Sequence, residues 1–274
     1  MNKTQVTKTS RKDCNHNTII DCKNVFFGEG YFTVIAGPCA IENLEMALQT
    51  AKELKINGVK VMRCSIFKPR TSPYSYQGYG KAGTEIIDAI KNETGLLVES
   101  EVLSFDHLNI LYDHIDLIRI GSRNMDNYEL LKEIGKICKP VILKRGMSAT
   151  LKEFLSAAEY IMSAGNENII LCERGIRSFE TYTRNTLDIL AIPALKELTH
   201  LPVIVDPSHS SGKSSLVSSA SKAAIAAGAD GLLVEVHPDP SKALSDGAQS
   251  LDFNTFKILL DQLKKLSDVF DKEY

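Results

Sequence analysis

Residues 201–210 read LPVIVDPSHS, in which a short apolar run, Val203–Val205, ends on Asp206 and His209. A continuous Val/Ile run of this length is typical of a parallel strand buried on both faces. The same arrangement occurs eight times along the chain, with helical patterns between nearly all of the runs. The runs are Tyr31–Ala36, Gly58–Met62, Leu96–Val98, Leu117–Ile120, Val141–Leu143, Ile169–Leu171, Val203–Val205 and Leu232–Val234. This alternation predicts an α/β fold, a (β/α)8 TIM barrel.

The length of 274 residues suits one such barrel, whose typical size is roughly 250 residues. We expect a short N-terminal extension over residues 1–30, partly disordered or a short strand pair, with the first 17 residues frayed. The catalytic barrel is expected over residues 31–274. Helical spacing is clear in 43–56, 126–137, 149–164, 186–198, 214–227 and 253–271. The Pro/Gly/Tyr-rich stretch 67–83 predicts a long functional loop.

Composition excludes several classes of protein. A net charge of −2 gives no global attraction to nucleic acid or to membranes. No apolar stretch approaches the ~20 residues that span a bilayer, and the polar N-terminus lacks the apolar core of a signal peptide. The six cysteines form no CxxC pair. We therefore expect a cytoplasmic protein without disulfides.

Four metal-ligating side chains come from separated segments of the chain. Cys39, His209 and Glu235 follow the first, seventh and eighth predicted strands, which are neighbours in a closed barrel. Asp246 lies in the loop after Glu235. A thiolate, an imidazole and two carboxylates suit a borderline divalent ion such as Mn, Fe, Zn or Co. Scattered single ligands are a weak signal, and a structural histidine is the alternative interpretation.

Cations also gather at the predicted strand ends. They are Arg63, Lys68, Arg70, Arg123, Lys144 and Arg174. Phosphorylated substrates would balance this charge, because a phosphate carries about −1.5 to −2 at neutral pH. Two alternatives stay open: the cations are a solvated surface, or Lys144 is a Schiff-base lysine of the aldolase type. A nucleotide-binding loop at 208–214 is excluded, since Pro207 stands where its first glycine is required.

Several longer motifs resemble one known family, 3-deoxy-7-phosphoheptulonate (DAHP) synthase of the short, type I-beta kind. They are Gly37-Pro-Cys-Ala-Ile-Glu42, Lys68-Pro-Arg-Thr-Ser-Pro-Tyr-Ser-Tyr-Gln-Gly78, Leu143-Lys-Arg-Gly146, Glu173-Arg-Gly-Ile-Arg177, Asp206-Pro-Ser-His209 and Glu235-Val-His-Pro-Asp-Pro followed by Asp246-Gly247. The sister family, 3-deoxy-8-phosphooctulonate (KDO8P) synthase, typically has Lys-Ala-Asn-Arg-Ser where this chain has Lys68-Pro-Arg-Thr-Ser. The resemblance therefore favours erythrose 4-phosphate over arabinose 5-phosphate as the aldehyde.

The resemblance implies a role for each motif residue. It implies a metal held by Cys39, His209, Glu235 and Asp246, and phosphoenolpyruvate held by Arg63, Lys68, Arg123, Lys144 and Arg174. It implies that Arg70 and Thr71 take the phosphate of erythrose 4-phosphate and that Asp206 takes its hydroxyls. Lys68, Cys39 and His209 would be the catalytic residues, with Lys68 relaying a proton. The expected activity is the first step of the shikimate pathway, catalysed by a transferase that serves aromatic amino acid biosynthesis.

The resemblance has one departure and leaves three matters open. Many relatives carry a further arginine where this chain has Ser214. KDO8P synthase and a catalytically silent homologue are the alternative functions. We expect a homotetramer or a homodimer. The barrel leaves no room for an appended regulatory domain, so we expect either insensitivity to aromatic amino acids or control through a separate regulatory chain.

Overall fold

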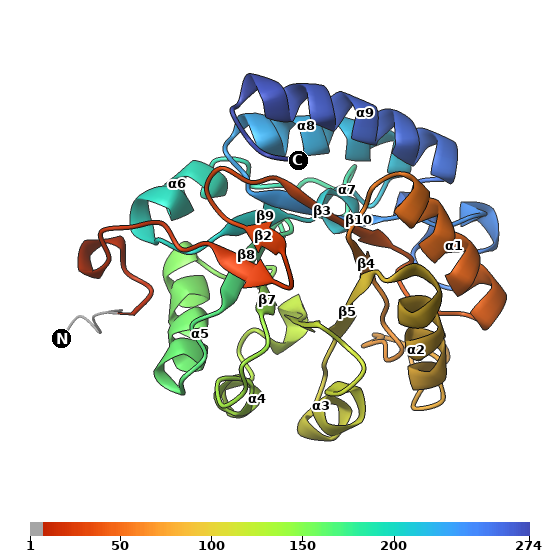
Figure 1. Ribbon diagram of the computed structural model, residues 1–274. Helices are drawn as coiled ribbons and strands as arrows, with labels where there is room; N and C mark the ends of the chain where they lie inside the picture. The colour runs from red at the N-terminus through yellow and green to blue at the C-terminus, as the bar shows by residue number, and fades with distance from the viewer. Residues whose placement is uncertain (1–7) are drawn as a thin grey trace.

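The computed structural model describes residues 8–274 and contains a closed barrel of eight parallel strands. Around the ring the order is β10-β3-β4-β5-β6-β7-β8-β9 (Figure 1). The strands are β3 (Thr33–Gly37), β4 (Val61–Arg63), β5 (Leu97–Glu101), β6 (Leu117–Ile120), β7 (Val141–Lys144), β8 (Ile169–Glu173), β9 (Val203–Val205) and β10 (Gly231–Glu235). The predicted (β/α)8 barrel is confirmed.

The α-helices surround the barrel as an outer ring (Figure 1). They are α1 (Leu44–Ile56), α2 (Gly83–Thr94), α3 (Phe105–Leu111), α4 (Tyr128–Ile134), α5 (Leu151–Ser163), α6 (Ala191–Leu198), α8 (Ser214–Ala226) and α9 (Phe253–Val269). Their starts follow local capping chemistry. Asn43 caps α1, and Thr150 and Glu153 form a reciprocal capping box at α5.

One predicted helix begins later than expected. The spacing predicts a helix over 186–198, whereas α6 begins at Ala191. The reason is a long-range pairing: the backbone N–H of Thr186 donates to the carbonyl of Ile176, and the N–H of Ile176 donates to Thr186, both at 2.9 Å. The long loop predicted over 67–83 lies between β4 and α2, as expected.

Residues before the barrel lie against its lower, N-terminal end. The expectation of a frayed segment concerns in part residues 1–7, which lie outside the described residues. From residue 8 the chain is held: the backbone N–H groups of Lys8 and Thr9 donate to Glu159, and Arg11 donates to the carbonyl of Thr199 at 2.8 Å. The chain then forms an antiparallel hairpin of β1 (Ile20–Cys22) and β2 (Val25–Phe27). The division of the chain at residue 30 stays a prediction.

The hairpin closes the lower end of the barrel interior, and it crosses in front of the barrel in Figure 1. Its turn residues Lys23 and Asn24 both have positive φ, as a tight two-residue turn requires. The hairpin side chains pack on an interior cluster to which every barrel strand contributes. The cluster consists of Ile35, Val61, Leu97, Leu117, Ile142, Ile170, Cys172, Ile204 and Leu233. Below the catalytic end, the barrel is therefore a solid apolar core.

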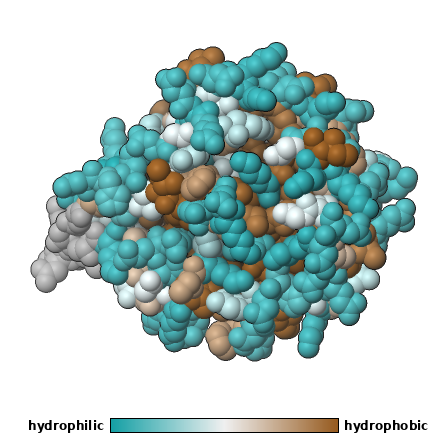
Figure 2. Space-filling view, viewed as in Figure 1, coloured by the Kyte–Doolittle hydropathy of each residue, from teal (hydrophilic) through white to brown (hydrophobic). Residues whose placement is uncertain are grey.

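Seen from this lower end, hydrophilic residues cover most of the face and apolar ones are scattered among them (Figure 2). Within residues 8–274, no helix combines the length and the apolar character needed to cross a bilayer.

Candidate active site

The side chains that carry chemistry form the next layer up the barrel. Because successive strand residues point to opposite faces, each apolar interior residue is followed two positions later by another interior residue. In six of the eight strands those positions hold Arg63, Glu99, Arg119, Lys144, Asp206 and Glu235, and in β3 and β8 they hold Gly37 and Cys172. All six are buried, with exposures between 0 and 4%. In these six strands the barrel interior therefore changes from apolar to ionic over two residues.

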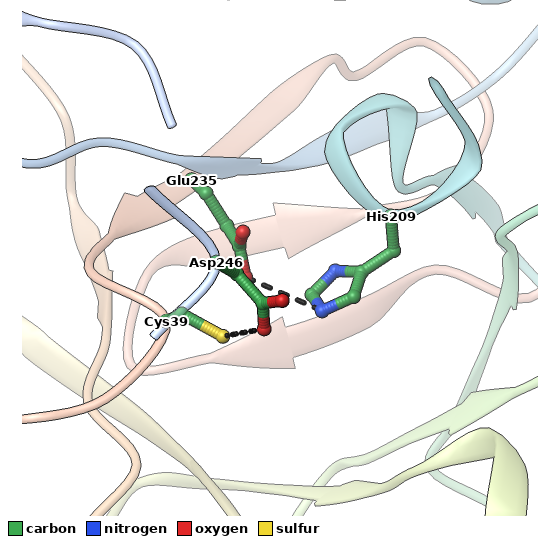
Figure 3. Close-up of side chains that lie close together, drawn as sticks. All are labelled: Cys39, His209, Glu235 and Asp246. Carbon is green, nitrogen blue, oxygen red and sulfur yellow. Dashed lines mark hydrogen bonds and ion pairs between the residues drawn. The ribbon is translucent and has the colours of Figure 1, made fainter. Parts of the chain in front are cut away.

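Four predicted ligands meet at one side of this layer. One ligand atom each from Cys39, His209, Glu235 and Asp246 lies within 4.8 Å of the others. The Cys39 thiol donates to Asp246 Oδ2 at 2.9 Å, and His209 Nε2 lies 3.3 Å from Glu235 Oε1 (Figure 3). Strand order predicted the convergence of Cys39, His209 and Glu235, and the structure brings Asp246 to the same place.

Local structure explains how two of these ligands are aimed. Gly37 ends β3 with φ of +147°, and a Cβ there would lie 2.5 Å from the carbonyl oxygen of Arg63. Only glycine lets the chain approach this closely and turn toward Cys39. Asp206 caps the short helix α7 (Pro207–Ser211), accepting from the His209 backbone N–H at 2.8 Å. His209 therefore projects from the first turn of α7 back over the barrel.

The protonation of His209 suits a metal ligand. Burial lowers the pKa of His209 to about 4, so the ring is neutral at pH 7. Its Nδ1 lies 2.8 Å from Asp206 Oδ2, and a carboxylate can only accept, so Nδ1 carries the proton. The lone pair on Nε2 is then directed toward Glu235. An outer carboxylate that fixes the tautomer in this way is typical of metal-bound histidines.

The other three ligands complete a donor set for a divalent cation. Burial, and next the charge of Glu235, raises the pKa of the Cys39 thiol to about 12, while Lys68 Nζ at 2.9 Å opposes that rise. Burial alone would raise the pKa of Glu235, but nearby positive charge, that of the Arg63 guanidinium included, holds it below its usual value. Glu235 Oε1 is buried without a hydrogen bond from the described residues. This orphaned oxygen beside a thiol, an imidazole and a second carboxylate fits a borderline divalent ion.

A cavity of about 230 Å³ opens beside the four ligands. Seven of the eight predicted substrate-binding residues line it, namely Arg63, Lys68, Arg70, Thr71, Arg123, Lys144 and Arg174. His209 and Asp246 form part of the same wall. The predicted cations are therefore not a solvated surface but the lining of one cavity.

Two guanidinium groups in this wall lack hydrogen-bond partners for several of their nitrogens. Among the described residues, none hydrogen-bonds to any nitrogen of the Arg63 guanidinium, or to Nε and Nη1 of Arg174. Arg63 is 0% and Arg174 4% exposed. Arg63 Nη2 lies 3.0 Å from Glu235 Oε1, close enough for an ion pair but not aligned for a hydrogen bond. Buried donors without partners are costly, so these groups indicate an anion-binding site.

The predicted loop after β4 folds over the cavity. Lys68 Nζ donates to both the carbonyl and the thiol sulfur of Cys39, at 3.0 and 2.9 Å. Arg70 Nη1 donates to Ser245 Oγ at 2.5 Å and lies 3.9 Å from Asp246 Oδ2. The loop therefore connects the metal ligands with the cationic wall.

Asp206 lies deeper than its predicted role suggests. It is fully buried, and its Oδ2 accepts from both Lys144 and His209. Lys144 Nζ is thus held against a buried carboxylate at the end of β7. Residues 207–211 form helix α7, which agrees with the exclusion of a nucleotide-binding loop.

Sequence reasoning missed two arginines of the cavity wall, Arg119 and Arg184. Arg119 Nε lies 3.1 Å from Glu99, its Nη2 lies 3.4 Å from Glu101, and Nη2 also donates to Ser65. A charged residue inside the otherwise apolar run Leu117–Ile120 was the available signal. Arg184 comes from the irregular segment between β8 and α6, where no period points to the barrel.

Comparison with known proteins was made for the whole chain. A protein-family model described as "DAHP synthetase I family" matches residues 5–271. A Thermotoga maritima protein named phospho-2-dehydro-3-deoxyheptonate aldolase is 53% identical over 259 residues, which cover 94% of this chain and 77% of that protein. A Magnetococcus marinus protein named 2-dehydro-3-deoxyphosphooctonate aldolase is 34% identical over 255 residues, covering 86% of this chain and 88% of that protein.

Solved structures lead to the same group. The crystal structure of the Thermotoga maritima phospho-2-dehydro-3-deoxyheptonate aldolase (DAHP synthase) superposes with a TM-score of 0.95 and 51% identity, covering 97% of this chain and 78% of that one. A truncated form of 3-deoxy-D-arabino-heptulosonate 7-phosphate synthase from the same organism gives a TM-score of 0.91 and 48% identity, covering 97% of both chains. The fold is thus shared along nearly the whole length of this chain.

Proposed function

Because this chain belongs to the DAHP synthetase I family, we propose that the cavity at the top of its barrel is the active site for the family's reaction. The enzyme condenses phosphoenolpyruvate with erythrose 4-phosphate and water to give 3-deoxy-D-arabino-heptulosonate 7-phosphate and phosphate. This transferase reaction is the first step of the shikimate pathway. The observation that carries the site assignment is that two buried guanidinium groups with unsatisfied hydrogen-bond donors lie next to the four-ligand cluster.

Phosphoenolpyruvate binds in this proposal against Arg63, Lys68, Arg123, Lys144 and Arg174. The fork of an arginine matches a carboxylate or a phosphate in a bidentate manner, whereas a lysine contributes a point charge. Together the two substrates carry roughly four to five negative charges, which the cationic wall offsets. Substrate binding would also supply the acceptors that the buried guanidinium groups lack.

Erythrose 4-phosphate enters from the loop side, with its phosphate on Arg70 and Thr71. This places its aldehyde toward Cys39, His209, Glu235 and Asp246. A divalent ion held by these four residues would polarise the aldehyde oxygen as a Lewis acid, and Mn, Fe, Zn and Co all suit the donor set. C3 of phosphoenolpyruvate attacks the aldehyde carbon, water adds at C2, and phosphate leaves from the resulting hemiketal phosphate.

Three side chains act on protons or on other side chains in this scheme. Lys68 Nζ, beside the Cys39 sulfur, is placed to donate or relay a proton near the forming hydroxyl. Asp206 holds His209 and Lys144, and its predicted contact with substrate hydroxyls stays a prediction. Cys39 must ionise to bind the ion, so metal affinity falls in acid.

The comparisons support the seven-carbon product over the eight-carbon alternative. Identity is 53% to the heptonate aldolase but 34% to the octonate aldolase. A silent homologue is disfavoured because every residue that the resemblance implies is present. A cytoplasmic location, a homotetramer or homodimer, and control by a separate regulatory chain stay predictions.

The test is phosphate release from phosphoenolpyruvate, with erythrose 4-phosphate or arabinose 5-phosphate, before and after chelation and with Mn²⁺ added back. We expect release only with erythrose 4-phosphate, its loss on chelation and its recovery with Mn²⁺. Release with arabinose 5-phosphate would overturn the assigned role of the Lys68–Thr71 segment. Turnover by a metal-free Cys39→Ala variant would overturn the metal site.

A further inference from the structure

We propose that Gln249 and Arg184 form a two-residue clamp that positions the carboxylate ligands Glu235 and Asp246. The inference rests on the metal site proposed above and extends it to residues that no part of that proposal uses. Gln249 ends the short 3₁₀ helix η4 (Gly247–Gln249), and Arg184 comes from the segment between β8 and α6. We call these two residues the clamp.

The clamp is a continuous set of hydrogen bonds. Gln249 Nε2 donates to Glu235 Oε2 at 2.6 Å. Arg184 Nη1 donates to Gln249 Oε1 at 3.0 Å and to Asp246 Oδ1 at 3.1 Å. One guanidinium nitrogen therefore contacts one ligand directly and the other through a buried amide, whose residue is 2% exposed.

The guanidinium group determines which way the amide points. Arginine only donates hydrogen bonds, so the amide oxygen of Gln249 must face Arg184. The amide NH₂ must then face Glu235, whose ionised carboxylate only accepts. The reverse orientation would set two donors against each other and two acceptors against each other. Arg184 thus controls a contact to Glu235 that it does not itself make.

The clamp leaves one oxygen of each carboxylate directed at the other ligands. Glu235 Oε2 and Asp246 Oδ1 are engaged by the clamp. Glu235 Oε1 faces His209 Nε2 at 3.3 Å, and Asp246 Oδ2 faces the Cys39 sulfur at 2.9 Å. Each carboxylate is therefore arranged to offer one oxygen to a cation.

Arg184 is anchored to the helix that carries the third ligand. Its backbone N–H donates to the Ser211 carbonyl at 3.1 Å, and Asn185 Nδ2 donates to the His209 carbonyl at 3.0 Å. At Gly212, where φ is +67°, a Cβ would lie 2.5 Å from the Arg184 Cβ, so the two segments are in close contact. The clamp thus ties η4 to α7, and it links Glu235 and Asp246 mechanically to His209.

Cobalt(II) binding to the metal-stripped protein tests the clamp without using turnover. The readouts are Co²⁺ affinity, measured by competition with a chelator, and the visible d–d and thiolate charge-transfer absorption. The variants are Gln249→Leu, Arg184→Leu, the double variant, and Arg184→Lys. Gln262→Leu on α9 is the matched control, because Gln262 accepts from Ser218 and Lys222 away from the site.

We expect each single leucine variant to weaken Co²⁺ binding by about 10–100-fold, as is typical when an outer partner of a metal ligand is removed. The d–d spectrum should shift as the carboxylates reorient, and Gln262→Leu should match the wild type. Because the two residues act as a unit, the double variant should lose little more Co²⁺ affinity than the single variant that binds Co²⁺ more weakly. Arg184→Lys, which keeps the charge and a donor, should recover part of the affinity.

Two results would overturn the clamp: wild-type Co²⁺ affinity and spectrum in both leucine variants, or losses that add fully in the double variant. Thermal unfolding of the metal-free proteins separates clamp loss from misfolding, since Arg184→Leu removes a side chain that is 37% exposed and should leave the midpoint near that of the control. A wild-type protein that shows no Cys39-dependent Co²⁺ absorption would instead overturn the metal site on which the clamp rests.

Discussion

The two ends of the barrel are built from the same eight strands but handle buried charge in opposite ways. At the lower end, buried carboxylates are satisfied by the protein. Asp230 accepts from the backbone N–H of Val203 at 2.8 Å and pairs with Lys196 and Lys272. At the upper end, Arg63 and Arg174 are buried with nitrogens that no described residue hydrogen-bonds.

Along each strand, the residues that stabilise the fold therefore differ from the residues that would bind ligands. The apolar layer and the hairpin at the lower end contribute the burial that holds the fold together. The ionic layer two residues later carries a desolvation cost that ligands would offset. Substitutions at the upper end should therefore change binding without loss of stability, and substitutions at the lower end should do the reverse.

The largest expected effect comes from Arg174→Met at the upper end. Loss of one partner of a buried charge-assisted contact costs up to about 5 kcal/mol, so kcat/KM for phosphoenolpyruvate should fall by roughly three to four orders of magnitude. The free energy of unfolding without substrate should not fall, because burial already lowers the pKa of Arg174 and two of its nitrogens lack partners. Steady-state kinetics and urea unfolding measure the two quantities.

Substrate-linked stabilisation gives a second view of the same variant. At a concentration 100 times its Kd, phosphoenolpyruvate should raise the stability of the wild type by about 2.7 kcal/mol and leave Arg174→Met nearly unchanged. A variant that loses stability in the absence of substrate would show that Arg174 supports the fold, and the proposed separation of the two ends would fail there.

The next largest effect is expected at the lower end, from the substitution Phe27→Ala in the hairpin. Phe27 is 0% exposed and packs into the interior cluster below the active site. Its truncation should lower the free energy of unfolding by about 3–4 kcal/mol and leave the KM for phosphoenolpyruvate unchanged. Ile19→Ala, beside the hairpin and 50% exposed, is the control and should cost little. If Phe27→Ala instead raised the KM for phosphoenolpyruvate and left the free energy of unfolding unchanged, the lower end would serve binding and not stability.

Much of this contrast between the two ends could be predicted from the sequence, because each apolar run is followed by a polar or charged residue. The run Val203–Val205 is β9 without any shift of its ends. Because Arg63, Lys144 and Asp206 directly follow such apolar runs, the sequence placed them at the mouth of the barrel. The predicted helix over 186–198 failed in its first five residues because the Ile176–Thr186 pairing is a tertiary contact, which local periodicity does not contain.

The parts of the site that escaped prediction lie off the strands. Arg184 and Gln249 belong to irregular segments, and their role follows from hydrogen bonds between residues 65 positions apart. Asp206 was predicted to meet substrate hydroxyls, but its burial under Lys144 and His209 depends on how α7 folds back over the barrel. Strand ends can be read from a pattern, whereas the outer partners of a site depend on loop geometry.

The smallest expected effect tests a satisfied charge at the lower end. Asp116 is 5% exposed and accepts from the backbone N–H of Val98 at 2.9 Å, with Lys23 and Lys91 at 2.5 and 3.0 Å. Asp116→Asn keeps an acceptor for Val98 but removes the charge. The free energy of unfolding at pH 7 should fall by about 1.5–3 kcal/mol, the range for hydrogen bonds to charged groups, with no change in KM.

The pH dependence shows whether the Asp116 charge is responsible. Burial alone would raise the pKa of Asp116, but Lys23, the Val98 N–H and Lys91 lower it below its usual value in the folded protein. The stabilisation is then fully present above the unfolded-state pKa of about 3.9, and it is lost as the pH falls through the lower folded-state pKa. Urea unfolding at pH 7 and at about pH 3 should therefore show the gap between wild type and Asp116→Asn narrowing in acid. A gap that persists at about pH 3 would mean that Asp116 acts through its shape and not through its charge. The buried carboxylates of the lower end would then no longer contrast with the guanidinium groups of the upper end, whose hydrogen-bond donors are unsatisfied.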